Sequence, residues 1–236
     1  MNRKKMEDQN RHNIKGMTLI ELLIGMIICA MVISGIYRVF IAQSKAYTVQ
    51  DQVVEVQQSV RSAMEILLRD LRMTGFDFDN LNSPITITTP IASPLSDNAI
   101  KVIYEYYDKN AAQYQKHTVA YWRDAASSTM FRQLTVNDIE GPQEPLLENV
   151  DEFSLTYGVD SNEDGALDDR NGDGVITGET FPVGDFLPAG AVEMSKVVAV
   201  RVTLTARPIQ VNPDMKAVSP RTLVSMVTLR NLCLVR

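Results

Sequence analysis

The longest apolar run of the chain lies close to its start. Residues 17–37 read MTLIELLIGMIICAMVISGIY and contain one charged side chain, Glu21. A helix of this length rises about 31 Å at 1.5 Å per residue, which matches the hydrocarbon core of a bilayer. The pattern therefore predicts a helix that spans a membrane.

Residues 38–74 are more polar but keep a helical period. Their apolar side chains recur mostly every three or four positions, at Val49, Val53, Val56, Val60, Met64, Leu67 and Leu71. One such stripe is typical of an amphipathic helix that packs on a folded domain. Proline is absent before Pro84, and Gly75 is suited to a helix C-cap. We therefore expect a single helix from Met17 to Thr74.

A free coiled coil, as in a membrane-anchored sensor, is the alternative interpretation of this stripe. A coiled coil favours leucine repeated at one heptad position, and the stripe lacks that repeat. Packing on a domain is therefore the favoured interpretation.

Residues 75–236 have the pattern of a β-rich domain. Short β-branched and aromatic runs predict strands at Ile85–Thr89, Ile100–Tyr107, His117–Arg123, Met130–Leu134, Phe153–Val159, Lys196–Ala206 and Arg221–Leu229. The prolines between these runs, Pro142 and Pro145 among them, are interpreted as breaks. A helix followed by antiparallel strands predicts an α+β fold with the long helix against one face of the sheet.

The averages of the whole chain describe an ordinary protein of one or two domains, with 236 residues, 45% hydrophobic residues and a net charge of −6. The acidic balance argues against nucleic acid as a partner, because phosphates are neutralised by Lys and Arg. The charge is unevenly distributed, since residues 1–16 contain five basic and two acidic side chains. A positive segment before an apolar helix predicts that the N-terminus stays in the cytoplasm and the remainder is exported.

The basic segment ends at Gly16, before the apolar run, whereas a secretory leader is cut after its apolar region. Cleavage after Gly16 would remove a leader of net +3 from a chain of net −6, leaving residues 17–236 with a net charge of −9. Glu21 would then lie about one helical turn from the new α-amino group. A carboxylate in hydrocarbon costs about 2.5–3.5 kcal/mol and usually marks function. An amine and a carboxylate are natural partners there, within a chain or between neighbours.

The stretch KGMTLIELLI at residues 15–24 resembles the N-terminal signal of the type IV pilin and type II secretion pseudopilin superfamily. That signal has Gly before the scissile bond, Thr-Leu-Ile-Glu-Leu after it and then a long apolar run. The resemblance implies that a prepilin peptidase cleaves after Gly16 and that the amine of Met17, where the family most often has Phe, is methylated. It also implies that Glu21 neutralises the N-terminus of an adjacent subunit during assembly.

Weaker local resemblances in the head are to PilW-type minor pilins and J-type pseudopilins. They lie at residues 118–123, 131–134, 147–150, 155–160 and 227–232. The resemblance implies a pilin-like α+β fold and a minor pilin at the tip of a type IV pilus, with a type II secretion minor pseudopilin as the alternative. The implied partners are other minor and major pilins, the prepilin peptidase, the inner-membrane assembly platform and membrane lipid. The implied location is the bacterial inner membrane, with a periplasmic head, and then the pilus at the cell surface.

An acidic loop at residues 160–180 is the second informative segment. The pattern D-x-N-x-D-G occurs twice, and the candidate ligands are Asp160, Asn162, Asp164, Asp168, Asp169, Asn171 and Asp173. Alternate oxygen-bearing side chains with glycine at the turn are what Ca²⁺ coordination requires. Neither half has Glu at loop position twelve, where Asn171 and Thr180 stand, so an EF-hand domain is not predicted. We expect a structural calcium loop between strands, and a solvated pair of Asx turns is the alternative.

The sequence predicts no enzyme. It contains no nucleophile elbow, zinc-protease, Walker A or Rossmann motif, and its histidines are His12 in the leader and His117 in a strand pattern. The alternative from another functional class is a single-pass periplasmic calcium-binding or sensor protein with an uncut N-terminus. An anchored hydrolase would need a catalytic set that these residues do not supply.

Overall fold

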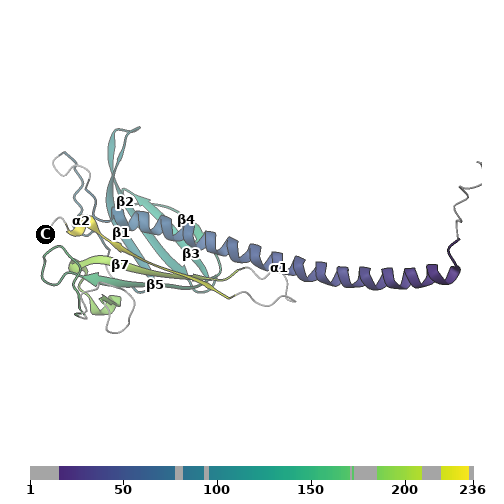
Figure 1. The fold of residues 1–236 in the computed structure, drawn as a ribbon. Coiled ribbons are helices and arrows are strands. Elements are labelled where there is room, and N and C mark those ends of the chain that lie inside the picture. Colours follow the sequence, from purple (N-terminus) through teal and green to yellow (C-terminus); the bar gives the residue numbers. More distant parts are fainter. Residues whose placement is uncertain are drawn as a thin grey trace, which may run out of the picture. The chain divides into compact units, whose positions relative to one another are not determined.

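The computed structural model describes residues 16–77, 82–92, 96–170, 172, 185–208 and 219–233. The chain divides into two compact units, residues 1–49 and residues 50–236. One long helix, α1 (Leu19–Met73), begins in the first unit and ends in the second (Figure 1). The predicted continuous helix is therefore confirmed, and it starts slightly later and ends slightly earlier than expected.

The second unit contains two antiparallel sheets of four strands each. The first is a meander in the order β1 (Ala99–Asp108), β2 (Gln113–Asp124), β3 (Thr129–Val136) and β4 (Ile139–Leu147). The second has the order β6 (Phe186–Leu187), β5 (Val150–Val159), β7 (Val197–Ala206) and β8 (Arg221–Thr228). Two 3₁₀ turns, at Ala189–Ala191 and Met194–Lys196, and a short helix α2 (Arg230–Cys233) complete the described elements.

Six of the seven predicted strands correspond to β1, β2, β3, β5, β7 and β8, and the α+β architecture is confirmed. The prediction of a strand at Ile85–Thr89 is wrong. This segment makes no strand, and only Ile91 forms an isolated bridge, to Val102 on β1. Pro84 and Pro90 flank the run and lack the N–H donors that a strand ladder uses, which explains the failure.

Strand β4 was missed because it contains Pro142 and Pro145, which were interpreted as breaks. The strand lies at the edge of the first sheet, and β3 is its one partner among the described strands. Proline is tolerated on such an edge, since an outward-facing position has no ladder hydrogen bond to lose. The tight turn before it is made by Asn137 and Asp138, both in the left-handed backbone region that favours a two-residue hairpin.

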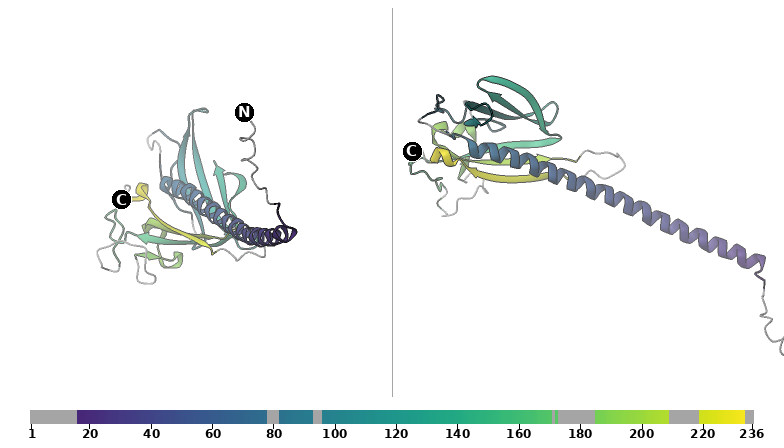
Figure 2. Two further views of the ribbon diagram at one scale, coloured as in Figure 1. Left: turned by 45° about the vertical axis from the view of Figure 1, so that its right-hand side comes forward. Right: turned by 90° about the horizontal axis from the view of Figure 1, so that it is seen from above.

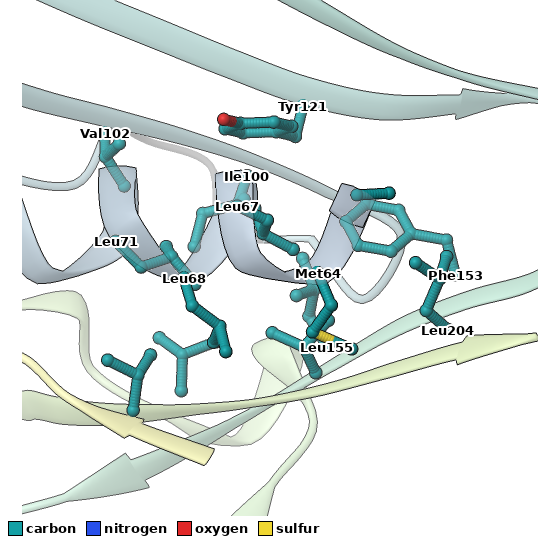
Figure 3. Close-up of a cluster of buried hydrophobic side chains, with 14 of the residues drawn as sticks. Met64, Leu67, Leu68, Leu71, Ile100, Val102, Tyr121, Phe153, Leu155 and Leu204 are labelled. Carbon is teal, nitrogen blue, oxygen red and sulfur yellow. The ribbon is translucent and has the colours of Figure 1, made fainter. Parts of the chain in front are cut away.

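The second half of α1 is buried between the two sheets. Its buried apolar side chains are Val60, Ala63, Met64, Leu67, Leu68 and Leu71. Figure 3 shows this part of the helix between Ile100, Val102 and Tyr121 of the first sheet and Phe153, Leu155 and Leu204 of the second. The views in Figure 2 show the same layering. The helix thus packs against both sheets, whereas the sequence predicted packing against one face of a single sheet.

A buried polar cluster joins the helix to the first sheet. Asp70 on α1 is buried, and its Oδ2 accepts hydrogen bonds from the Tyr121 hydroxyl at 2.5 Å and from Arg132 Nη2 at 2.9 Å. Burial and the hydrogen bond to Asp70 raise the pKa of Tyr121, so this hydroxyl remains a donor over the physiological range. Arg132 Nη1 also lies 3.8 Å from Glu144, whose side chain is 64% exposed.

Two carboxylates beside Arg132 allow a matched test of this cluster. Asp70→Ala leaves the half-buried guanidinium of Arg132 and the buried Tyr121 hydroxyl without their shared acceptor, so we expect a loss of about 1–3 kcal/mol in the free energy of unfolding. Glu144→Ala removes an exposed partner and should cost less than about 1 kcal/mol. Urea unfolding of the full chain in detergent measures both variants. Equal losses would contradict the role given to Asp70.

The buried tyrosines predict a loss of stability in alkali. Burial raises the pKa of Tyr104 to about 12, and burial also raises that of Tyr157 and Tyr121. Because these folded-state pKa values exceed the unfolded value of about 10, stability is complete below that pH and falls as the pH rises above it. The Tyr121→Phe variant should show a smaller fall between pH 9 and about 11 than the wild type. Tyr106→Phe, at an exposed side chain, is the control in the same unfolding series.

Candidate functional site

The first turn of α1 is closed by a capping box. The Thr18 hydroxyl accepts a hydrogen bond from the Glu21 backbone N–H at 3.3 Å, and the Thr18 N–H donates to Glu21 Oε2 at 2.9 Å. The same Oε2 accepts the Thr18 hydroxyl proton at 2.9 Å. This reciprocal pairing satisfies N–H groups that have no partner within the helix. The pattern T-x-x-E before an apolar run is the sequence signal of such a box, although the box was not among the predicted features.

Glu21 therefore has two separable features, a capping interaction and a negative charge. Its side chain is exposed, and the capping contacts use Oε2. The Oε1 atom accepts no hydrogen bond from any residue that the structure describes. The carboxylate is thus held near the start of the helix in a fixed position, with one oxygen directed to no described partner. This geometry suits a fixed negative charge offered to a cation outside the chain.

The apolar first half of α1 offers its side chains to the surroundings. Within the described part of the chain, α1 is the helix that is long and apolar enough to cross a membrane, and none of its most apolar stretch is buried. The exposure of large apolar side chains continues past Tyr37 to Val39, Phe40, Ile41 and Tyr47. The surface that needs an apolar partner is therefore longer than the predicted span of residues 17–37.

The acidic loop begins where β5 ends, and its first carboxylate is buried. Asp160 Oδ1 accepts a hydrogen bond from the Asp164 N–H at 3.1 Å, and its Oδ2 accepts one from the Gly165 N–H at 2.9 Å. Asp168 Oδ2 accepts the Ser161 N–H at 2.9 Å. Backbone donors thus converge on these carboxylates, which stabilises the turn in the way typical of Asx motifs.

The remaining candidate ligands lie along the same loop. Asn162 Oδ1 accepts the Asp164 N–H at 3.1 Å, and Asp169 Oδ1 accepts the Gly172 N–H at 2.8 Å. A close apolar contact anchors the loop to the sheet, because a Cβ at Gly158 would lie 2.4 Å from a methyl group of Leu167. The second half of the predicted calcium motif, Asn171 and residues 173–180, lies outside the described residues.

The described half of the loop supplies oxygen ligands of the type that Ca²⁺ prefers. Among the described residues, no three His, Cys, Asp or Glu side chains are grouped so that they could hold a metal ion. The carboxylates of Asp160 and Asp168 both accept backbone hydrogen bonds within the loop. The calcium loop therefore remains a prediction that needs Asn171 and Asp173 as further ligands.

Chelation tests that prediction directly. If Ca²⁺ joins the two halves of the loop, EDTA should lower the melting temperature of the full chain and added Ca²⁺ should restore it. Asp164→Asn at an exposed loop position should weaken the response to Ca²⁺, while Asp138→Asn, at an exposed hairpin distant in sequence, should not. An unchanged melt on chelation would contradict a structural calcium.

His117 occupies a packed position in β2. Its ring stacks on Tyr106 with centroids 4.9 Å apart, and it lies 5.6 Å from the ring of Tyr104. Burial lowers its pKa, so the neutral form predominates. The residue thus packs beside two tyrosine rings on the sheet, in agreement with the predicted strand position.

Comparison with known families identifies one segment of the chain. Residues 11–37 match the family described as prokaryotic N-terminal methylation motif. The match contains Gly16, Met17 and Glu21 together with the predicted membrane span. No match is found among curated proteins. The match thus characterises the start of the chain and leaves the head to be interpreted from its structure.

Proposed function

We propose that this pilin-like chain, whose N-terminal motif places it in the type IV pilin and pseudopilin family, acts as a minor pilin in type IV pilus assembly. The observation that carries the proposal is that the methylation motif covers the start of α1, where the helix is capped and its apolar side chains are exposed. The chain's partners are, in general terms, other pilins and the prepilin peptidase. A role at the pilus tip, in the initiation of assembly, is the specific part of the proposal.

The proposed mechanism is assembly rather than catalysis. Cleavage after Gly16 removes the basic leader, and α1 then stores the subunit in the inner membrane with its head in the periplasm. The assembly platform moves the subunit into a helical bundle of minor and major pilins, where neighbouring helices replace lipid along the apolar side chains. Glu21 meets the methylated amine of Met17 of an adjacent subunit, which sets the axial register of the new subunit.

The size of the head supports a minor rather than a major subunit. Two four-stranded sheets enclose the second half of α1, which makes a bulky unit for a repeating filament. The alternative is a J-type minor pseudopilin of type II secretion, which would use the same processing and assembly chemistry. A single-pass periplasmic sensor is the alternative from another class, and it requires an intact N-terminus.

Processing is the first test of the proposal. Mass spectrometry of the protein from cells that contain the prepilin peptidase should find a chain that begins at Met17 with a methylated amine. A Gly16 variant with a larger side chain should retain the leader in the same cells. An intact leader on the wild-type protein would refute the pilin assignment and favour the sensor.

The capping box makes it possible to separate the charge of Glu21 from its structural role. Glu21→Gln keeps an oxygen acceptor for Thr18 but removes the charge, Thr18→Ala keeps the charge but removes the cap, and Glu21→Leu removes both. We expect all three variants to be cleaved. Incorporation into pili, measured by immunoblots of sheared filaments, should fall at least about tenfold for the two Glu21 variants and far less for Thr18→Ala. Normal incorporation of Glu21→Gln would remove the role given to the charge.

A further inference from the structure

The second sheet has an open edge at β8. In the order β6-β5-β7-β8, this strand pairs with β7 and with no other strand that the structure describes. The Leu229 N–H donates to Val198 O at 2.7 Å, in the register that also places Val227 opposite Val200. Antiparallel strands alternate between bonded and non-bonded pairs. The residues whose N–H and C=O groups point away from β7 are therefore Thr222, Val224, Met226 and Thr228.

These four residues present both backbone and side chains to the outside. All four side chains are exposed, and two of them, Val224 and Met226, are apolar. Their backbone groups make no hydrogen bond with another residue in the described part of the chain. An edge of this kind is a template for an added strand. By contrast, the β4 edge of the first sheet carries Pro142, Pro145 and the exposed Glu144, features that block such pairing.

A groove with two arginines lies at one end of the β8 edge. Its volume is about 410 Å³, and its lining residues are Arg72, Met226, Val227, Thr228 and Arg230. Arg72 belongs to α1, which packs against the inner face of the sheet, whereas Met226 and Thr228 are exposed on the opposite face of β8 from the buried Val227. The groove therefore lies where an added strand would run.

Both arginines of this groove are exposed. Like Arg61 elsewhere on α1, Arg72 and Arg230 form no ion pair with any residue that the structure describes, whereas Arg132 pairs with Asp70 and Arg207 pairs with Asp151. Two uncompensated positive charges beside the groove favour a partner that carries carboxylates. The exposed apolar side chains of β8 favour a partner with apolar residues at alternate positions.

We propose that the β8 edge is a docking site for an extended segment of alternating acidic and apolar residues from a neighbouring subunit. That segment adds a strand next to β8, and its carboxylates lie near Arg72 and Arg230. Backbone hydrogen bonds provide affinity, and the two arginines select the sign of the partner's charge. The placement of the segment on a neighbouring subunit rests on the proposed function, whereas the chemistry of the edge does not.

Peptide binding to the full chain in detergent tests the proposal without pilus assembly. The probe is a fluorescent ten-residue peptide of alternating Glu and Val, followed by anisotropy. It should bind at least about tenfold more tightly than the same peptide with Lys in place of Glu. Methylation of every backbone nitrogen, which removes the donors along both edges of the peptide, should abolish binding. Equal binding of the Lys peptide or of the N-methylated peptide, or no binding at all, would overturn the proposal.

Variants of the protein locate the site. Arg72→Glu combined with Arg230→Glu should weaken binding at least about tenfold, while Arg61→Glu on the exposed face of α1 is the matched control. Val224→Pro removes an outward N–H without breaking the β7 ladder, so it should also prevent binding, with Val224→Thr as its control. Circular dichroism checks that each variant is folded, and the N-methylated peptide decides the question if Val224→Pro is not.

A second copy of the chain is the other possible occupant of the β8 edge, and sedimentation tests for it. Sedimentation of the full chain should give the same size for wild type and Val224→Pro at the concentrations used for peptide binding. Association through β8 that excludes the peptide would overturn the proposal, because the occupant would be a second copy of β8. A negative result in these assays leaves N-terminal processing and pilus assembly, which are measured separately, unaffected.

Discussion

The head depends on the burial of one face of α1 between two sheets. Met64, Leu67 and Leu71 are almost fully buried, and each such side chain contributes about 1.5–3 kcal/mol through removal from water. Residues of both sheets join the same apolar cluster as the helix. Neither sheet could bury its inner face in this way without the helix, because the two four-stranded layers meet across it (Figure 3).

The buried Asp70 makes this packing specific in position and rotation. An apolar stripe alone tolerates small rotations and shifts of a helix, since hydrophobic contacts are not directional. Hydrogen bonds from Tyr121 and Arg132 to one carboxylate require a single arrangement of α1 on the first sheet. The cluster thus links residues far apart in sequence. It fixes the position of the same segment of α1 that the apolar core surrounds.

The two ends of α1 differ in what their side chains contact. At the start, Thr18 and Glu21 satisfy backbone donors that have no partner within the helix, and the exposed apolar side chains that follow require lipid or other helices. In the last turns, the apolar side chains of Leu67, Leu68 and Leu71 pack against the two sheets of the same chain. The edges of the two sheets also differ in their capacity to pair with another strand. The β4 edge carries proline and exposed charge, whereas the β8 edge has outward-facing backbone groups with exposed arginines beside it.

The sequence by itself determined the features that are encoded locally. Charge followed by Gly16 and an apolar run identified the N-terminal methylation motif, a three-to-four-residue period identified the helix, and alternation identified six strands. These signals arise from neighbouring residues, so they can be recognised without knowledge of the fold. The capping box at Thr18 and Glu21 belonged to the same class and was available in the sequence.

The tertiary structure alone decided how these elements combine. The division into two sheets, the tolerance of Pro142 and Pro145 on an edge, and the open backbone of β8 all depend on which strands become neighbours. In the sequence, Asp70 is one of many polar residues on the helix. Its hydrogen bonds with Tyr121 and Arg132 form only when the helix packs on the first sheet. Strand order and buried polar pairing are set by contacts between residues distant in the chain, and local periodicity contains no information on them.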